Sequence, residues 1–204
     1  MTEKLDTIII GGGQAGLSLS YLLTQQGREH LVLEKAAKAG EAWRHRWDSF
    51  TFVTPNWAIR LPGAEYRGND PDGYMPRDDI VAMFEQYAQS LPARYGAQAT
   101  AVKQTEAGYT VETGAGAFEA TNVVAVTGSF QTPKIPSFSA NLPANILQLH
   151  SGEYRNPGAL PPGAVLVIGS GQSGCQIAEE LYQSGRKKYD KKTGVSQWLT
   201  PVSF

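Results

Sequence analysis

The sequence is poor in the residues that covalent and metal chemistry use. Among its 204 residues it has one cysteine, Cys175, and three histidines. A single cysteine excludes an internal disulfide framework, a Cys-x-x-Cys redox pair and a cysteine-rich zinc site. We therefore expect no metal centre, and a reducing cytoplasmic environment is the default interpretation.

The sequence also lacks long apolar runs and an excess of charge. Its apolar stretches are only a few residues long, whereas roughly 20 are needed to span a bilayer, and the acidic start of the chain does not resemble a signal peptide. Lysine and arginine total 18 against 19 aspartates and glutamates, which gives a net charge of −1. Neither nucleic acid nor a membrane is therefore expected as a partner. A hydrophobic fraction of 41% is that of an ordinary globular protein.

Glycine, by contrast, is abundant, and six glycines fall in a repeated pattern. Residues 7–27 read TIIIGGGQAGLSLSYLLTQQG and residues 165–185 read VLVIGSGQSGCQIAEELYQSG. Each copy has a short apolar strand pattern, glycines spaced G-x-G-x-x-G, a helical segment and a terminal glycine. This order is typical of a βα unit that opens a dinucleotide-binding fold.

The first copy carries the full context of such a unit. Thr7–Ile10 predicts a buried strand, a helix begins near Gln14, and Leu31–Leu33 predicts a second strand. The expected helix face consists of Ala15, Leu19, Leu22 and Leu23. The three glycines of the turn are Gly11, Gly13 and Gly16. They allow the tight turn, the approach of a pyrophosphate and the packing of helix on strand.

Glu34 follows the second strand, 23 residues after Gly11. The acidic residue that binds a ribose hydroxyl is expected roughly 20 residues on, so the pattern predicts a bound dinucleotide. Two simpler interpretations stay open: a glycine-rich turn can be only a turn, and Glu34 can be a solvated carboxylate at a strand end.

The second copy has only half of this context. Val165–Ile168 predicts a strand and Gln176–Ser184 a helix, with Gly169, Gly171 and Gly174 between them. Where a second strand should follow, residues 186–192 read RKKYDKK. The half unit is expected to pack on the rest of the chain or on another chain, so a homo-oligomer is compatible with it. The alternative for this motif is a packing turn, and Cys175 is expected to be a packing residue.

The middle of the chain combines aromatic, helical and strand patterns. Residues 40–60 hold Trp43, Trp47, Phe50, Phe52 and Trp57 with Arg44 and Arg46, which could stack on a flat ring system or form a hydrophobic loop. A helix capped by Asp78 is expected to bury Val81, Phe84, Ala88 and Leu91. Strands are predicted at Ala101–Thr105, Tyr109–Thr113, Ala117–Ala120 and Val123–Val126.

These elements predict an α/β protein. Its first part is a Rossmann-like nucleotide domain over residues 1–160, with a parallel sheet and a β-meander. Residues 161–186 begin a second Rossmann unit, and residues 187–204 form a polar tail.

The motifs together resemble the flavin-containing monooxygenase family, in its bacterial and plant-like branch. The residues that carry the resemblance are IIIGGGQAG, GEAWRHRW, TPNW, VVAVTGSFQTPKIP and VIGSGQSG. The family signature F-x-G-x-x-x-H-x-x-x-Y falls on ANILQLHSGEY, with His150 and Tyr154 present but Ala144 and Ile146 at the phenylalanine and glycine positions. The resemblance covers residues 1–186, and the segments that complete the two nucleotide domains in family members are lacking. A truncated or internally deleted member is therefore expected.

The resemblance implies FAD and NADP as cofactors. NADPH would reduce FAD, and the reduced flavin would activate O₂ to oxygenate a small molecule with a soft nucleophile or a small carbon substrate. The implied catalytic residue is Asn56. The implied cofactor-binding residues are Gly11, Gly13, Gln14, Ala15, Gly16, Glu34, Lys35, Trp43, Arg44, Val102, Thr127, Gly128, His150, Gly169, Gly171, Gln172, Ser173 and Gly174. For His150 a plain surface position is the alternative. For the whole chain, the alternative is a non-catalytic FAD- or ADP-binding remnant without a working NADPH site. A pyridine-nucleotide disulfide reductase would need a second cysteine.

Overall fold

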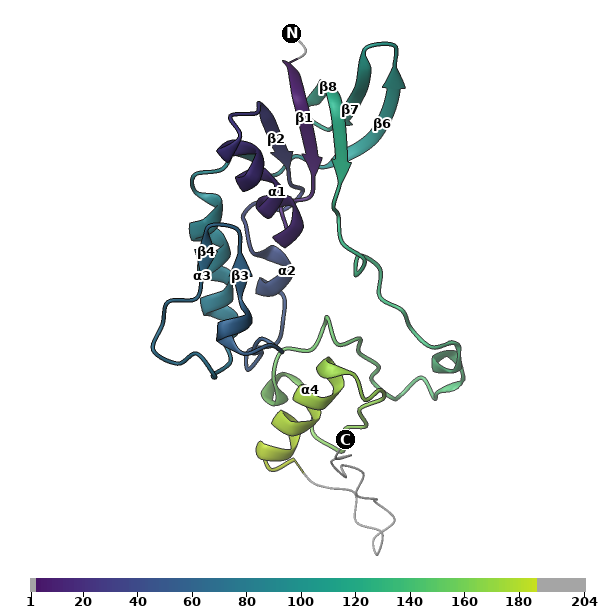
Figure 1. Cartoon of the computed structure of the whole chain (residues 1–204). Helices are drawn as coiled ribbons and strands as arrows, with labels where there is room; N and C mark the ends of the chain where they lie inside the picture. The colour runs from purple at the N-terminus through teal and green to yellow at the C-terminus, as the bar shows by residue number, and fades with distance from the viewer. Residues whose placement is uncertain (1–2, 187–204) are drawn as a thin grey trace, which may run out of the picture. The chain divides into compact units, whose positions relative to one another are not determined.

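The computed structural model describes residues 3–186, which form two compact units (Figure 1). The first unit takes the described residues up to 44 and residues 54–132. The second takes residues 45–53 and the described residues from 133 onward. Residues 133–160, which the sequence assigns to the first nucleotide domain, thus group by contact with the second glycine motif. The predicted limits of the two nucleotide domains stay a prediction, and the predicted tail at 187–204 lies outside the described residues.

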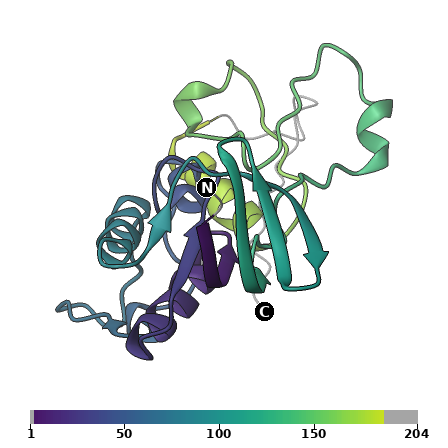
Figure 2. The same ribbon diagram turned by 90° about the horizontal axis from the view of Figure 1, so that it is seen from above.

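The first unit is built on a mixed sheet of six strands, in the order β5-β2-β1-β8-β7-β6. The strands are β1 (Glu3–Ile10), β2 (His30–Leu33), β5 (Ala93–Arg94), β6 (Ala99–Thr105), β7 (Gly108–Thr113) and β8 (Gly116–Ala125). β1 pairs in parallel with β2 and β8, and β2 pairs in parallel with β5. The other half, β8-β7-β6, is an antiparallel meander beside β1 (Figure 2). The predicted α/β architecture is therefore confirmed.

Strand β8 is one long strand, not the two separate strands that the sequence predicted. It pairs with β7 over Gly116–Ala120 and with β1 as far as Ala125. The polar residues Thr121 and Asn122 interrupt the apolar pattern but face solvent, so they do not interrupt the backbone pairing. β8 therefore joins the meander to the parallel half of the sheet.

Helices α1 (Gln14–Gln25), α2 (Glu41–Arg44) and α3 (Arg77–Ala88) belong to the first unit, together with the short strands β3 (Arg60–Leu61) and β4 (Ala64–Glu65) and the turn η1 (Asn56–Ala58). The predicted core face of α3 is correct, because Val81, Phe84, Ala88 and Leu91 are all buried. The predicted face of α1 is wrong in part. The helix buries Gly16, Leu17, Ser20 and Leu23, while Leu22 is exposed.

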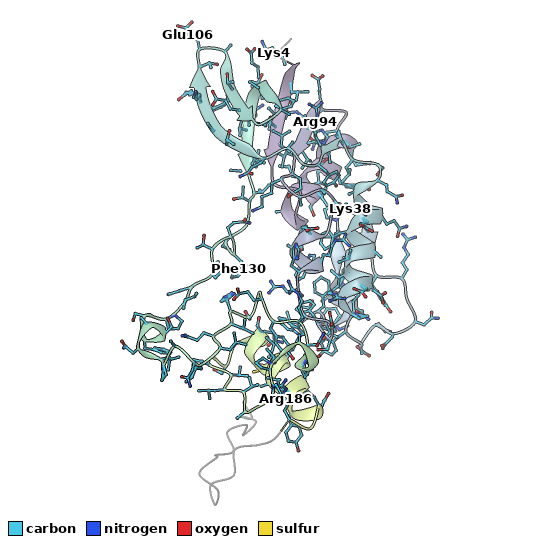
Figure 3. All side chains as sticks on the ribbon, turned by 180° about the vertical axis from the view of Figure 1, so that it is seen from behind. Lys4, Lys38, Arg94, Glu106, Phe130 and Arg186 are labelled. Atoms are coloured by element: carbon cyan, nitrogen blue, oxygen red, sulfur yellow. The ribbon has the colours of Figure 1, made fainter. Side chains whose placement is uncertain are left out.

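The second unit contains α4 (Gln172–Gln183) and the turns η2 (Ser137–Asn141) and η3 (Pro157–Ala159). The aromatic segment joins this unit through backbone hydrogen bonds, since the Asp48 N–H donates to the Arg155 carbonyl at 2.8 Å. Arg186 follows α4 and donates to the carbonyls of Pro157 and Leu160, both at 2.6 Å (Figure 3). This fixes the end of the helix to the turn η3.

The predicted strand at Val165–Ile168 is not formed. The segment belongs to no sheet, and Leu166 is 73% exposed. A parallel strand needs neighbours on both sides, and within residues 3–186 no strand pairs with it. The helix after it does form, and it begins at Gln172, four residues before the predicted Gln176.

Candidate dinucleotide site

The first glycine turn is shaped by close contacts that leave no room for a side chain at Gly11 or Gly16. Gly11 has φ of 115°, and a Cβ there would lie 2.5 Å from the Val126 carbonyl oxygen. A Cβ on Gly16 would overlap the carbonyl oxygen of Gly11. A Cβ on Gly13, by contrast, would meet nothing within 4 Å. The turn therefore packs tightly on its inner side and is open at Gly13, where the pyrophosphate of a ligand could approach the protein backbone.

The open side of the turn is also the start of α1. Gly13 is the N-cap and offers no side chain to cap the helix, and Gln14 and Ala15 are exposed beside it. The first N–H groups of a helix have no partner within the helix, and the helix dipole places positive charge there. Such an N-terminus favours a pyrophosphate.

Glu34 holds the turn to the end of β2. The Gly12 N–H donates to Oε2 of Glu34 at 2.6 Å, and the Ala36 N–H donates to Oε1 at 2.7 Å. Each carboxylate oxygen thus accepts one backbone hydrogen bond and can accept a second one from a ligand. This is the arrangement expected for a carboxylate that accepts hydrogen bonds from ribose hydroxyls.

A third segment, residues 94–97, lines Glu34 and was not anticipated from the sequence. The Glu34 N–H donates to the Arg94 carbonyl at 3.0 Å, and the Ala97 N–H donates to the Glu34 carbonyl at 2.8 Å. Arg94 (labelled in Figure 3) turns its guanidinium over the Phe118 ring at 4.9 Å. The next residue, Tyr95, has a buried hydroxyl oxygen with no hydrogen-bond partner within residues 3–186. The only sequence signal was a tyrosine beside glycine after a proline, which is too common to single out.

Lys35, Thr127 and Gly128 lie at the same edge of the sheet. Lys35 Nζ donates to the Gln131 side-chain oxygen at 2.7 Å, and Gln131 Nε2 donates to the Thr127 carbonyl. Gly128 has φ of 77°. β2, β1 and β8 all end here, at the carboxyl edge where α/β proteins bind ligands.

Val102 does not reach this edge. It lies on β6, three strands away from β1, where it pairs with Val111 and is 46% exposed. The structure therefore does not bring it to the glycine turn.

Trp43 and Arg44 form part of α2 and contact α3. Trp43 stacks on Phe84 with ring centroids 6.3 Å apart. Arg44 forms ion pairs with Glu85 at 2.8 Å and Glu41 at 3.3 Å. Both side chains thus have protein partners, and their predicted place along a flavin stays a prediction.

Asn56 is only 5% exposed, although asparagine is a polar residue. Its Nδ2 donates to the Asp70 carbonyl at 2.9 Å, and its backbone N–H donates to the Gly73 carbonyl at 2.9 Å. Its Oδ1 atom is buried and has no hydrogen-bond partner in the described part of the chain. A fixed amide therefore presents one acceptor that the protein does not use.

The second glycine turn repeats the first in backbone geometry. Gly169 has φ of 110°, and a Cβ on Gly174 would overlap the Gly169 carbonyl oxygen. Gly171 caps α4 as Gly13 caps α1, and Gln172 and Ser173 begin the helix. A Cβ on Gly169 would meet nothing within 4 Å. No residue therefore packs against this turn at Gly169 in the way that Val126 packs against the first turn at Gly11.

His150 and Tyr154 occupy a loop of the second unit. His150 Nδ1 accepts a hydrogen bond from the Gly152 N–H at 3.2 Å. Tyr154 is 4% exposed, and its hydroxyl donates to Glu180 Oε2 on α4 at 2.6 Å. Burial, and secondarily the Glu180 carboxylate, raise the pKa of Tyr154. The signature loop is thereby attached to the helix that follows the second glycine turn.

Residues 3–186 contain neither a metal-binding cluster nor a membrane-spanning helix. No group of three or more histidine, cysteine, aspartate or glutamate side chains is placed to hold a metal ion. No helix there has the length and apolar character for a membrane span.

The parallel strands, the glycine turn and Glu34 define an α/β fold of the kind that dinucleotide-binding proteins have. Residues 8–202 match the model of the pyridine nucleotide-disulphide oxidoreductase family. The chain belongs to this family.

Its relatives support the resemblance to flavin-containing monooxygenases. An uncharacterized CzcO-like oxidoreductase of Geobacillus kaustophilus is 39% identical over 89% of this chain and 52% of its own length. The indole-3-pyruvate monooxygenase YUCCA1 of Oryza sativa is 28% identical over 88% and 46%. The structure of a flavin-containing monooxygenase from Stenotrophomonas maltophilia matches with a TM-score of 0.81 and 29% identity, over 89% of this chain and 56% of that one. The chain spans about half the length of these relatives.

Proposed function

We propose that the chain binds FAD at the first glycine turn and acts in a flavin-dependent monooxygenase-type oxidoreductase that uses NADPH and O₂. The observation that carries the proposal is the pair of hydrogen bonds from Gly12 and Ala36 to Glu34, next to a turn open at Gly13. This combination supplies a ribose acceptor and a pyrophosphate site at adjacent positions.

The residues present fit the adenosine diphosphate half of FAD. The pyrophosphate would lie at Gly13 and the first N–H groups of α1, and Glu34 would accept hydrogen bonds from the ribose. Lys35 places a positive charge beside them, held by Gln131. FAD, when bound, would supply the electron transfer and the activation of O₂, which no side chain provides.

The protein's part at the reacting end falls to Asn56. Its buried Oδ1 is a fixed acceptor, and the hydrogen bond from Nδ2 to Asp70 holds the amide in one orientation. We infer that Oδ1 of Asn56 accepts a hydrogen bond from the bound flavin or substrate and so orients the reacting part of that molecule. The relatives' names favour a monooxygenase reaction, and the substrate class we propose is a small molecule with a soft nucleophilic atom or a small carbon substrate.

The proposal is tested on the purified 204-residue chain by its absorbance spectrum, an FAD titration and an NADPH oxidation assay in air. Bound flavin together with NADPH consumption supports the whole proposal. Bound flavin without NADPH consumption limits the function to an FAD- or ADP-binding module. A chain that takes up neither FAD nor ADP at millimolar concentration contradicts it.

A further inference from the structure

Tyr95 stands beside the carboxylate of the candidate site in a segment of fixed backbone. Besides the two bonds to Glu34, the Gly96 N–H donates to the Ala36 carbonyl at 2.8 Å. Parallel pairing with β2 ends at Leu33 and Arg94, and Tyr95 and Gly96 form a turn that these hydrogen bonds hold against residues 34–36. The position of Tyr95 does not depend on its own hydroxyl group.

The Tyr95 hydroxyl has no role in the folded protein that residues 3–186 reveal. Its oxygen is buried and has no hydrogen-bond partner in that range. Buried polar groups are nearly always paired, and an exception calls for a specific explanation. A phenylalanine would fill the same volume without leaving a buried hydroxyl unpaired, so packing does not explain a tyrosine here.

The surroundings keep this hydroxyl protonated and able to donate. Burial, and after it the negative charge of Glu34, raise the pKa of Tyr95. Glu34 is an acceptor only, since both of its oxygens face donors from Gly12 and Ala36. A ligand with two adjacent hydroxyl groups could donate to Glu34 and accept from Tyr95 at the same time.

We propose that the Tyr95 hydroxyl donates a hydrogen bond to the 2′,3′-diol of the adenosine ribose in the bound dinucleotide. Tyr95 and Glu34 then bind the diol as a donor and acceptor pair. This inference rests on the proposed function, because it requires an adenine dinucleotide at the first glycine turn.

The test compares two ligands and three proteins. ADP and 2′,3′-dideoxy-ADP are titrated calorimetrically into the flavin-free wild type, Tyr95→Phe and the control Tyr74→Phe, whose side chain is 55% exposed. We expect Tyr95→Phe to weaken ADP binding about three- to tenfold, the value of one hydrogen bond, and to leave dideoxy-ADP binding unchanged. The control should bind both ligands like the wild type.

The melting temperature of the ligand-free protein separates binding from structure. Tyr95→Phe should melt at the wild-type temperature or above it, since it removes only an unpaired buried group. A lower melting temperature with unchanged ADP affinity would show a structural role and overturn the inference. So would an equal loss of affinity for both ligands, which places the contact away from the diol. Failure of the wild type to bind ADP or FAD overturns the proposed function as well, whereas wild-type binding that Tyr95→Phe does not alter overturns this inference alone.

Discussion

At Glu34 one side chain joins the glycine turn, β2 and the next loop. Its two oxygens accept from Gly12 and Ala36, and its backbone bonds to Arg94 and Ala97. The same carboxylate that would bind a ligand therefore also stabilises the glycine turn itself. A site of this kind is preorganised, because its acceptor does not have to move when the ligand enters.

Replacing Glu34 with glutamine should cost stability as well as affinity. The amide has one oxygen, so the N–H of either Gly12 or Ala36 loses its acceptor and faces an NH₂ group. We expect a loss of about 1–3 kcal/mol in the free energy of unfolding, measured by urea denaturation. The matched control is Glu119→Gln, at an exposed position on β8. Equal stabilities of the two variants would show that Glu34 does not fasten the turn.

Two glycines of the same turn should respond differently to alanine. At Gly16 the added Cβ overlaps the Gly11 carbonyl oxygen, so the fold should lose about 1–3 kcal/mol, as in overpacked cores. At Gly13 the space is open and φ is −81°, so the melting temperature should change little, while FAD affinity should fall on the order of tenfold. Thermal unfolding and FAD titration of both variants check this. If Gly13→Ala is destabilised as much as Gly16→Ala, the turn is not open at Gly13.

At the scale of elements, the sequence predicted the helices and strands in which the pattern of apolar residues is uninterrupted. The first βαβ unit, α3 and the meander follow from apolar periodicity and from glycines at the turns. β5 is too short to leave a pattern, because two residues pair with β2 through the backbone alone. The residues around Glu34 on this strand and the loop after it, Tyr95 among them, could not be found for the same reason.

The face of α1 was missed because a polar pair is buried there. Ser20 is fully buried, and its hydroxyl lies 2.8 Å from His30 Nε2 on β2. A hydrophobic pattern assigns serine to the solvent side, but a serine whose partner lies across the interface can be buried without loss. The partner lies ten residues further along the chain, on the next strand, and only the fold shows that the two side chains meet.

The link between the signature loop and α4 gives a prediction at the same scale. Tyr154→Phe removes a buried hydrogen bond to a charged acceptor, Glu180. The free energy of opening of α4 should therefore fall by about 1.5–3 kcal/mol. Hydrogen exchange of the α4 amides at pH 8 measures this. Tyr74→Phe, in the first unit and 55% exposed, is the control and should exchange like the wild type.

The same bond should make the second unit sensitive to alkaline pH. The pKa of Tyr154 is raised above its ordinary value of 10.0 by burial and Glu180. The folded state therefore favours the protonated phenol, and its contribution is complete below about pH 10 and is lost as the pH rises further. Thermal unfolding between pH 8 and 11 should show the wild type approaching Tyr154→Phe above pH 10. A constant difference over this range would contradict the assignment.

At the scale of the whole molecule, the chain presents the same turn twice with different surroundings. Gly13 and Gly171 both cap 12-residue helices with extended backbone, at φ of −81° and −73°. The first turn has neighbouring strands and Glu34, whereas the segment before the second pairs with no strand in the described residues. The local sequence is therefore sufficient for the turn and its helix, but the strand depends on neighbours.

Because the two turns belong to separate units, we expect them to bind different nucleotides independently. Glu34 favours a ribose without a 2′-phosphate, so we expect FAD at the first turn and not 2′,5′-ADP, an analogue of the NADPH adenosine half. Gly13→Ala should therefore weaken FAD binding and leave 2′,5′-ADP binding unaffected. Gly171→Ala, where the added Cβ also meets nothing within 4 Å, should do the reverse, with a change on the order of tenfold in each case. Flavin absorbance and calorimetry on the two variants measure both affinities. If Gly171→Ala changes neither affinity, the second turn serves packing alone. If either variant weakens both ligands equally, the two turns do not bind independently.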